Sequence, residues 1–445
     1  MDYLIFMTGL LLLAAGTGGF FLYREDRQVS RWPLLALALI ALGGKLWFGL
    51  IVFALGLEGP LLLLHPLLAA VCAASLLGFA LSPLIEVQRT AFIMKWASMV
   101  AIFGIVFIAG TASLQSLWFI GPILAVSLFG GWQIAGFSDA LVERRKKFTH
   151  PLTTALPLAV VVAVSLLPGS VEAAYDALGE GGSQTRIAIL VALTAATAAS
   201  AVLCWRLWSI PYRKNRGQLS RSLLRRRRIG TSVILAAALF TVLNGAWLAH
   251  WLGNQAGKQQ TSTLLGALVL GAKNLDASLL DQIKGKPDEI ALAPFLTLHR
   301  QLREIRTALP RTRFAYLLGM RERQLVFLAD SEDPASADTF SPPGMRVEAA
   351  PGKWLPALAG DPVFFGPYRD HWGVWFSATV PVVRSDGKPA GLLVVDYPAA
   401  SWLQPLAARR LAAMGVTLSA ALLLIALFGI HLITIQASWR VEGLS

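Results

Sequence analysis

Cysteine and charged residues are scarce in this sequence, and each scarcity excludes a class of protein. Only two of the 445 residues are cysteines, Cys72 and Cys204, and both lie inside apolar stretches. A disulfide framework or a cysteine-ligated metal cluster is therefore not expected. The sequence also has no Walker-type phosphate loop, no His-Glu-x-x-His helix and no Gly-x-Ser-x-Gly elbow. We expect no metal, no cofactor and no catalytic residue within this chain.

Apolar residues, by contrast, make up 55% of the chain, and its mean hydropathy is +0.59. They occur in blocks of about 20 residues, the length at which a helix crosses the hydrocarbon core of a bilayer. Charged residues make up only 15% of the chain, far below their share in soluble domains. The sequence therefore predicts a polytopic α-helical membrane protein. The approximate ranges of the nine expected transmembrane helices are 3–22, 33–57, 61–82, 91–112, 117–137, 152–168, 187–205, 229–252 and 411–434.

Lysine and arginine outnumber aspartate and glutamate by 39 to 26, and their positions indicate the orientation in the membrane. Basic residues gather in alternate loops, whereas loops 57–60, 113–116 and 169–186 contain a single one, Arg186. By the positive-inside rule the basic loops are cytoplasmic. The N-terminus is then outside, residues 253–408 are extracytoplasmic, and the C-terminus is cytoplasmic.

The basic run Arg225–Arg228 directly precedes the eighth span. This position is typical of a topology anchor on acidic lipid. We therefore expect membrane lipid as a partner and no nucleic acid.

Ionisable residues inside a predicted span are costly, so each is a functional candidate. Lys45 lies near the middle of the second span, and two interpretations stay open for it. Either its ammonium is satisfied by neighbouring helices, or it belongs to a ligand or ion pathway. His65, just inside the third span, is a second candidate, with an interfacial hydrogen bond as the simpler interpretation. One deep charge without an internal repeat argues against a transporter.

The region 253–408 changes from a helical to a strand pattern along its length. A helix is predicted over 253–283, and an amphipathic helix over 295–309 is ended by Pro310. Two strand hairpins follow, separated by a loop rich in proline, serine and aspartate. Their strands are predicted at 314–320 and 324–329, then at 373–383 and 389–397. This order predicts an α+β domain with an antiparallel sheet.

The short runs 314–319, 328–331, 365–368, 371–375 and 394–397, closed by Trp402, follow one another in this region. Their succession resembles the PAS-like extracytoplasmic sensor domains (the Cache, or PDC, superfamily) of bacterial membrane receptors. The resemblance covers roughly residues 255–405 and implies a location in the bacterial inner membrane. In that family, ligands, where they bind, lie on a face of the central sheet. The ligand-binding residues implied here are Tyr316, Asp330, Tyr368, Trp372, Trp375 and Asp396.

Aromatic rings and carboxylates at these positions suit a small cationic or amino-acid-like ligand. The alternative is structural: Trp372 and Trp375 would be core aromatics, and Asp330 and Asp396 would form turns at strand ends. The Arg-x-Trp-Tyr pattern of amino-acid-binding family members is absent. Its absence counts against an amino acid as the ligand.

Together these patterns divide the chain into a seven-span membrane region (1–228), the eighth helix (229–252), a sensor domain (253–408), and the ninth helix with a cytoplasmic stub (409–445). The resulting hypothesis is a homodimeric receptor that senses an extracytoplasmic small molecule through a PAS-like domain inserted between its last two helices. It would signal to a cytoplasmic module or response regulator.

Only about ten residues follow the ninth span. Either the output module, a histidine kinase or a diguanylate cyclase, is expected beyond Ser445, or the output is expected to be delivered through a partner. Enzyme activity is expected only if the chain continues beyond Ser445. The alternative hypothesis is a polytopic transporter or membrane enzyme with an accessory outer domain.

Overall fold

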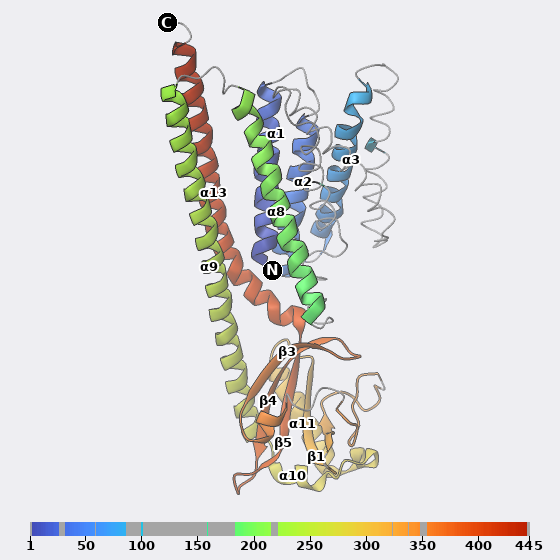
Figure 1. Cartoon of the computed structure of the whole chain (residues 1–445). Helices are drawn as coiled ribbons and strands as arrows, with labels where there is room; N and C mark the ends of the chain where they lie inside the picture. Colours follow the sequence, from blue (N-terminus) through green and yellow to red (C-terminus); the bar gives the residue numbers. More distant parts are fainter. Residues whose placement is uncertain are drawn as a thin grey trace. The chain divides into compact units, whose positions relative to one another are not determined.

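The computed structural model describes residues 2–25, 32–57, 59–85, 99–100, 158, 183–214, 221–322, 324–336, 338–347 and 354–442. Six helices within these ranges are long and apolar enough to cross a membrane. They are α1 (Asp2–Glu25), α2 (Trp32–Leu55), α3 (Leu64–Ile85), α8 (Ser183–Lys214), α9 (Arg221–Lys273) and α13 (Ala399–Glu442) (Figure 1). The spans predicted at 91–112, 117–137 and 152–168 lie almost wholly outside the described residues.

The chain divides into two compact units, and α9 and α13 contribute residues to both. The first unit contains α1 to α3, the described residues of Ile187–Leu252, and α13 from Ala407 onward. The second contains Gly253–Leu406, which we call the sheet domain.

Three helices of the first unit meet at the N-terminal end of α1. The buried carboxylate of Asp2 lies 2.8 Å from a guanidinium nitrogen of Arg410 in α13. The hydroxyl of Tyr3 donates to the carbonyl of Val242 in α9, at 2.7 Å. A Cβ atom at Gly245 would lie 2.5 Å from that hydroxyl, so only glycine allows this close an approach. We call this contact of α1 with α9 and α13 the N-terminal junction.

The sheet domain is built on five antiparallel strands in the order β2-β1-β5-β4-β3. Valine, leucine and aromatic residues dominate the strands, as expected for a pleated surface buried on both faces. The tight turn between the last two strands contains Gly387, whose φ of +82° favours glycine. The strands are β1 (Phe314–Arg321), β2 (Gln324–Asp330), β3 (Val363–Arg369), β4 (Val374–Val383) and β5 (Pro389–Pro398).

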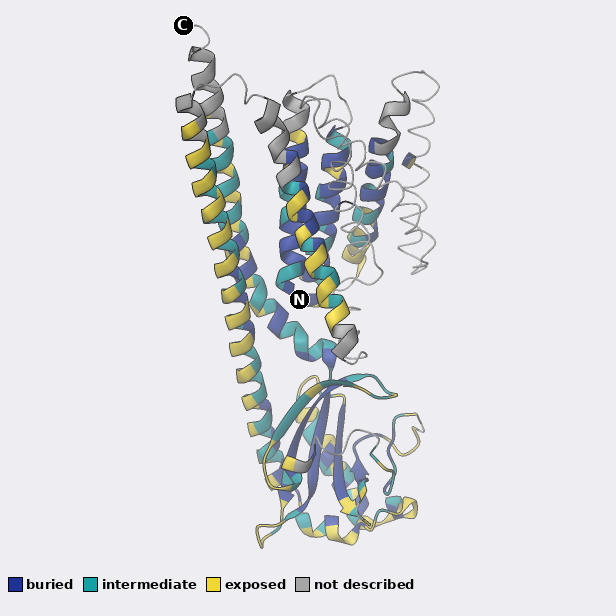
Figure 2. Ribbon diagram, viewed as in Figure 1, coloured by how far each residue is buried: buried dark blue, intermediate teal, exposed yellow. Residues whose placement is uncertain are grey.

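Helices cover one face of the sheet, which we call the helix face. The outer part of α9, α10 (Ala277–Gln282), α11 (Ala293–Ala308) and the start of α13 all bury side chains there. The strands contribute alternate residues to this core, because successive side chains point to opposite faces. Apart from Arg321 at the end of β1, the strand residues packed in this core are apolar or aromatic. Strands β1, β2, β4 and β5 are drawn mostly as buried in Figure 2. Fully buried residues of this core include Leu268, Leu280, Phe295, Leu298, Leu302, Leu317, Leu328, Val380 and Leu393.

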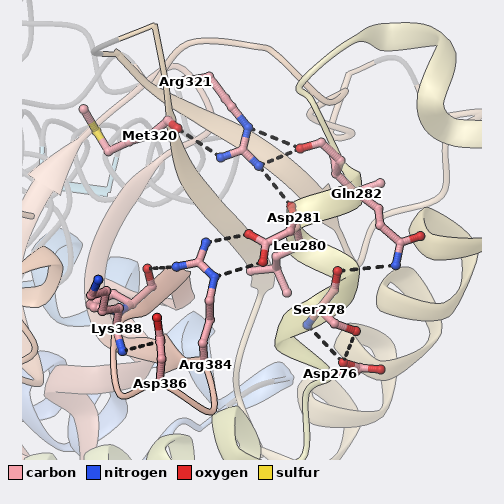
Figure 3. Close-up of polar contacts among 12 residues, drawn as sticks. Asp276, Ser278, Leu280, Asp281, Gln282, Met320, Arg321, Arg384, Asp386 and Lys388 are labelled. Carbon is pink, nitrogen blue, oxygen red and sulfur yellow. Dashed lines mark hydrogen bonds and ion pairs between the residues drawn. The ribbon is translucent and has the colours of Figure 1, made fainter.

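Two arginines of the sheet attach α10 to it (Figure 3). Arg321, at the end of β1, donates to the carbonyls of Leu280 and Ile283 at 3.0 and 2.6 Å. Arg384, after β4, donates from Nε to Asp281 at 2.9 Å and makes a second bond to the same carboxylate. The first arginine satisfies carbonyls that the end of a helix leaves unpaired. This short helix is therefore fixed to two different hairpins.

Both predicted hairpins are confirmed, as is the amphipathic helix before Pro310. The prediction of one helix over 253–283 was wrong: α9 ends at Lys273, and α10 begins anew after Asp276, whose carboxylate accepts from the amide of Ser278. Strand β3 was not predicted from the sequence. That strand contains Gly366 and Pro367, which favour a loop but are tolerated at the edge of a sheet.

Candidate ligand-binding site

The other face of the sheet, which we call the cavity face, contains a cavity of about 40 Å³. Its lining includes residues of four strands and of the segments that follow β2 and β3. Five of the six residues predicted from the resemblance line it: Tyr316, Asp330, Tyr368, Trp372 and Asp396. The fold thus brings together residues that are up to 80 positions apart in the sequence.

Strand register places four polar side chains in one row across this face. Phe314 of β1 and Ser377 of β4 lie directly opposite Asp396 of β5. Tyr316 follows Phe314 by two positions and so shares its face. Tyr368 of β3 lies diagonally across from Ser377. We call Tyr316, Asp396, Ser377 and Tyr368 the polar row; apolar and aromatic side chains form the surrounding core.

Asp396 is the centre of the polar row and is only 4% exposed. The hydroxyl of Ser377 donates to its Oδ1, and the hydroxyl of Tyr368 lies 3.4 Å from the same oxygen. Tyr316 interacts with the same carboxyl from the other side of the row. No ion pair among the described residues includes Asp396. Burial therefore raises the pKa of Asp396 to about 7, although the hydroxyl groups oppose the shift.

Asp330 is held differently, although it also lines the cavity. Its two carboxylate oxygens accept backbone amides, from Glu332 at 3.1 Å and from Ser341 at 2.9 Å. These bonds end β2 and fix the loop that follows, as the structural interpretation of Asp330 predicts. Burial raises the pKa of Asp330 to about 6, against the effect of those amides.

The two predicted tryptophans have different positions. Trp375 does not line the cavity: its ring packs on Phe314 with centroids 5.1 Å apart, and its Nε1 donates to Asp370 at 2.7 Å. These contacts favour the core interpretation of Trp375. Trp372 lines the cavity, and its Nε1 donates to the carbonyl of Asp338 at 2.6 Å.

Three residues of the site, Ser377, Asp370 and Trp354, were not predicted from the sequence. Ser377 gives only a weak signal, as one polar residue in an apolar strand. Asp370 is the acceptor that orients both tryptophans, through the amide of Trp372 and the indole of Trp375. Trp354 lines the cavity at 1% exposure, and its Nε1 has no hydrogen-bond partner within the part of the chain that the structure describes.

Lys45 and His65, the candidates in the predicted spans, are in the first unit and not in the cavity lining. Lys45 is 5% exposed in α2, and His65 is half-buried in α3. Both interpretations of Lys45 given above stay open.

No family model matches the chain, and neither does any curated protein or solved structure. The site is therefore interpreted from its own geometry.

Proposed function

We propose that this protein is a membrane receptor that binds a small extracytoplasmic molecule in the cavity of its sheet domain. The observation that carries the proposal is the polar row. Buried polar groups are costly unless they are paired, and the same strands bury only apolar and aromatic residues on the helix face. A row of hydroxyls and a carboxyl beside a cavity is the arrangement that small-molecule sites use for orientation and specificity.

The connection to α13 supports a signalling role. Asp396 of the polar row is three positions from α13, because β5 ends at Pro398 and α13 begins at Ala399. Trp402, in the first turns of α13, packs on Phe364 and Tyr397 of the sheet, with centroids 4.5 and 5.6 Å apart. A ligand that binds better to one arrangement of β5 would therefore bias the position of α13.

Helix α9 contacts the same part of α13. The side-chain amide of Gln260 lies 3.5 Å from the carbonyl of Trp402, and Leu264 and Leu268 of α9 belong to the same core as Trp402. Both helices that lead from the sheet domain to the apolar segments are thus packed on the sheet that carries the site. This arrangement supports transmission through α9 and α13.

The rest of the proposal follows from the resemblance to Cache domains and from loop charges. A five-stranded antiparallel sheet with helices on one face supports the PAS-like assignment. The proposed receptor is a homodimer in the bacterial inner membrane with its sheet domain outside. Its output is a histidine kinase or diguanylate cyclase module, joined beyond Ser445 or bound as a partner.

Thermal unfolding of the full chain in detergent, screened against a metabolite library, tests the binding step. Tyr368→Phe removes a hydroxyl from the polar row, and Tyr397→Phe makes the same change on the helix face. We expect at least one compound to stabilise the wild type and Tyr397→Phe but to stabilise Tyr368→Phe much less. Equal stabilisation of all three proteins, or none by any compound, would overturn the assignment of the site.

A further inference from the structure

We infer that the cavity takes a ligand whose buried end is a small ammonium group, which binds at Asp396 and displaces the proton of its carboxyl into water. This inference rests on the proposed function, because it names the ligand class of the same site. It also adds a property that the receptor hypothesis does not contain: the response to the ligand depends on external pH.

Three members of the polar row, Tyr316, Tyr368 and Asp396, line the cavity and offer it oxygen acceptors, whereas Ser377 lies outside the lining and donates to Asp396. Asp396 has two carboxylate oxygens, and Tyr316 and Tyr368 each have a hydroxyl that can accept as well as donate. An ammonium group has three N–H donors and no acceptor, so it is complementary to this row. A carboxylate ligand would meet Asp396 as a like charge.

The charges around Asp396 favour the same class. The titratable groups that face it are Tyr316 from β1, and Tyr368 and Asp370 at the end of β3. Elsewhere in the lining are Asp330 from the end of β2 and two groups with basic side chains, Arg346 and His371. Arg346 and His371 are exposed, whereas Asp330 and Asp396 are buried. The deep end of the cavity is therefore acidic and its basic groups lie at the rim.

Aromatic rings form much of the remaining wall, including Phe314, Tyr316, Trp354 and Trp372. Such rings attract a cation over their faces, more strongly when it is removed from water. One of them already has a cation: the guanidinium carbon of Arg313 lies 4.5 Å from the centroid of Phe314. The aromatic lining of the cavity is thus complementary to an ammonium group, as is the carboxylate of Asp396.

The size of the cavity limits the buried group. A volume of 40 Å³ holds about three water-sized groups, at roughly 10–15 Å³ each. This is the space of an ammonium nitrogen with two carbons, so a larger ligand would extend past the rim.

Binding of a cation is coupled to a proton because the pKa of Asp396 is raised to about 7 by burial. Below that pH the free site holds the carboxyl protonated, and the ammonium ligand must displace the proton before it gains its ion pair. The apparent affinity should fall about tenfold for each pH unit below 7 and stay constant above it. The displaced proton passes to bulk water, and the site remains neutral in total charge.

Ethylammonium chloride is the probe of matching size, with ethanol as its neutral analogue, sodium acetate as its anionic analogue and sodium chloride as the salt control. The full chain in detergent is heated at pH 8 with 0.1 M of each. A three-atom ligand binds no more tightly than about 1 mM. We expect ethylammonium alone to raise the unfolding midpoint, by about 2 °C or more. A titration should give an apparent dissociation constant about a hundredfold weaker at pH 5 than at pH 8.

Two variants serve as the matched pair. Asp396→Asn keeps the shape of the polar row but removes its charge, and Asp281→Asn removes a partly exposed carboxylate outside the cavity lining. Stabilisation by ethylammonium should be lost in the first variant and kept in the second. Equal stabilisation in both variants, no stabilisation of the wild type at pH 8, or an affinity independent of pH would overturn the inference.

The outcomes also separate this inference from the proposed function. If acetate or ethanol stabilises the wild type and Tyr368→Phe abolishes that effect, the cavity binds small molecules but not as a cation site. If the library and all three probes fail, the proposed function fails as well.

Discussion

The helix face and the cavity face of the sheet are made by alternate residues of the same strands, yet they bury different chemistry. On β4, Phe376, Ala378 and Val380 pack under the helices, whereas Ser377 and Thr379 point to the other side. The helix face is continuous apolar packing. The cavity face contains the carboxyl of Asp396, whose pKa is raised to about 7 by burial. The helix face therefore contributes most to stability. The cavity face contributes less, because it buries the polar groups of the binding site.

The largest loss of stability should come from a substitution in the core of the helix face. Phe295 of α11 is fully buried, and its replacement by alanine should cost about 3–5 kcal/mol through lost burial and an unfilled cavity. The adjacent Leu296 is 54% exposed, and Leu296→Ala should cost less than about 0.5 kcal/mol. The measurement is the unfolding midpoint of the full chain, with proteolysis of the sheet domain as a second readout. Similar losses in the two variants would contradict the conclusion that the core of the helix face supplies this stability.

The second-largest effect should be the pH dependence of stability, which arises from the cavity face through Asp396. Because the pKa of Asp396 is near 7 when folded and near 4 when unfolded, the folded state binds the extra proton between these values. Its contribution to stability is therefore largest at low pH, and stability should fall by on the order of 2–4 kcal/mol as pH rises from 4 to 7. In Asp396→Asn the part of the slope due to Asp396 should disappear, whereas the part due to Asp330, whose pKa is raised to about 6, should remain.

Asp281, which binds α10 to Arg384, should give a pH dependence of stability with the opposite sign. Its hydrogen bonds to Arg384 and the charge of that arginine lower its pKa. Its contribution should be present at neutral pH and should be lost only as the pH falls below about 4. Unfolding midpoints of Asp396→Asn and Asp281→Asn, measured from pH 3 to 8, should therefore differ from the wild type in separate windows. A wild-type midpoint that is unchanged between pH 4 and 7 would contradict the buried state of Asp396.

A smaller loss is expected for Ser377→Ala. Its hydroxyl is buried, donates to Asp396 and lies 2.8 Å from the hydroxyl of Tyr368. Its removal should cost about 1–3 kcal/mol, because it leaves buried polar groups with one partner fewer. The same change should raise the pKa of Asp396 further, which would move the pH transition of stability upward. A transition at the same pH as in the wild type would show that this bond does not support the carboxylate.

The smallest effect, with the opposite sign, is expected two positions further along β4. Thr379 is fully buried, and its hydroxyl has no hydrogen-bond partner among the described residues. Thr379→Val keeps the shape and removes the unpaired group, so it should be neutral or stabilising by up to about 1 kcal/mol. A loss comparable to that of Ser377→Ala would mean that Thr379 also belongs to the polar network.

Local patterns predicted much of the sheet, whereas the site depended on register. The hairpin around Asp386 and Gly387 could be predicted because alternation and turn residues are visible over ten positions. The edge strand β3 could not, since Gly366 and Pro367 contradict a strand locally and only its pairing with β4 supports one. Five of six expected site residues line the cavity, because the resemblance specified positions on one face. Ser377 was missed, since a single serine has no local pattern that places it opposite Asp396.

The ion pair between Arg410 and Asp2 could not be predicted from a local sequence pattern either, because 408 positions separate the two residues. At the N-terminal junction, the first turn of α1 is bonded to α9 and α13 at once. Sliding of one of these helices along the other by a full turn would be 5.4 Å, far beyond the reach of a 2.7 Å hydrogen bond. Any such movement must either break these bonds or carry α1 with it. The bonds of Asp2 and Tyr3 thus add to the mechanical stiffness of the helix pair, because a large displacement costs the energy of breaking them or of moving α1.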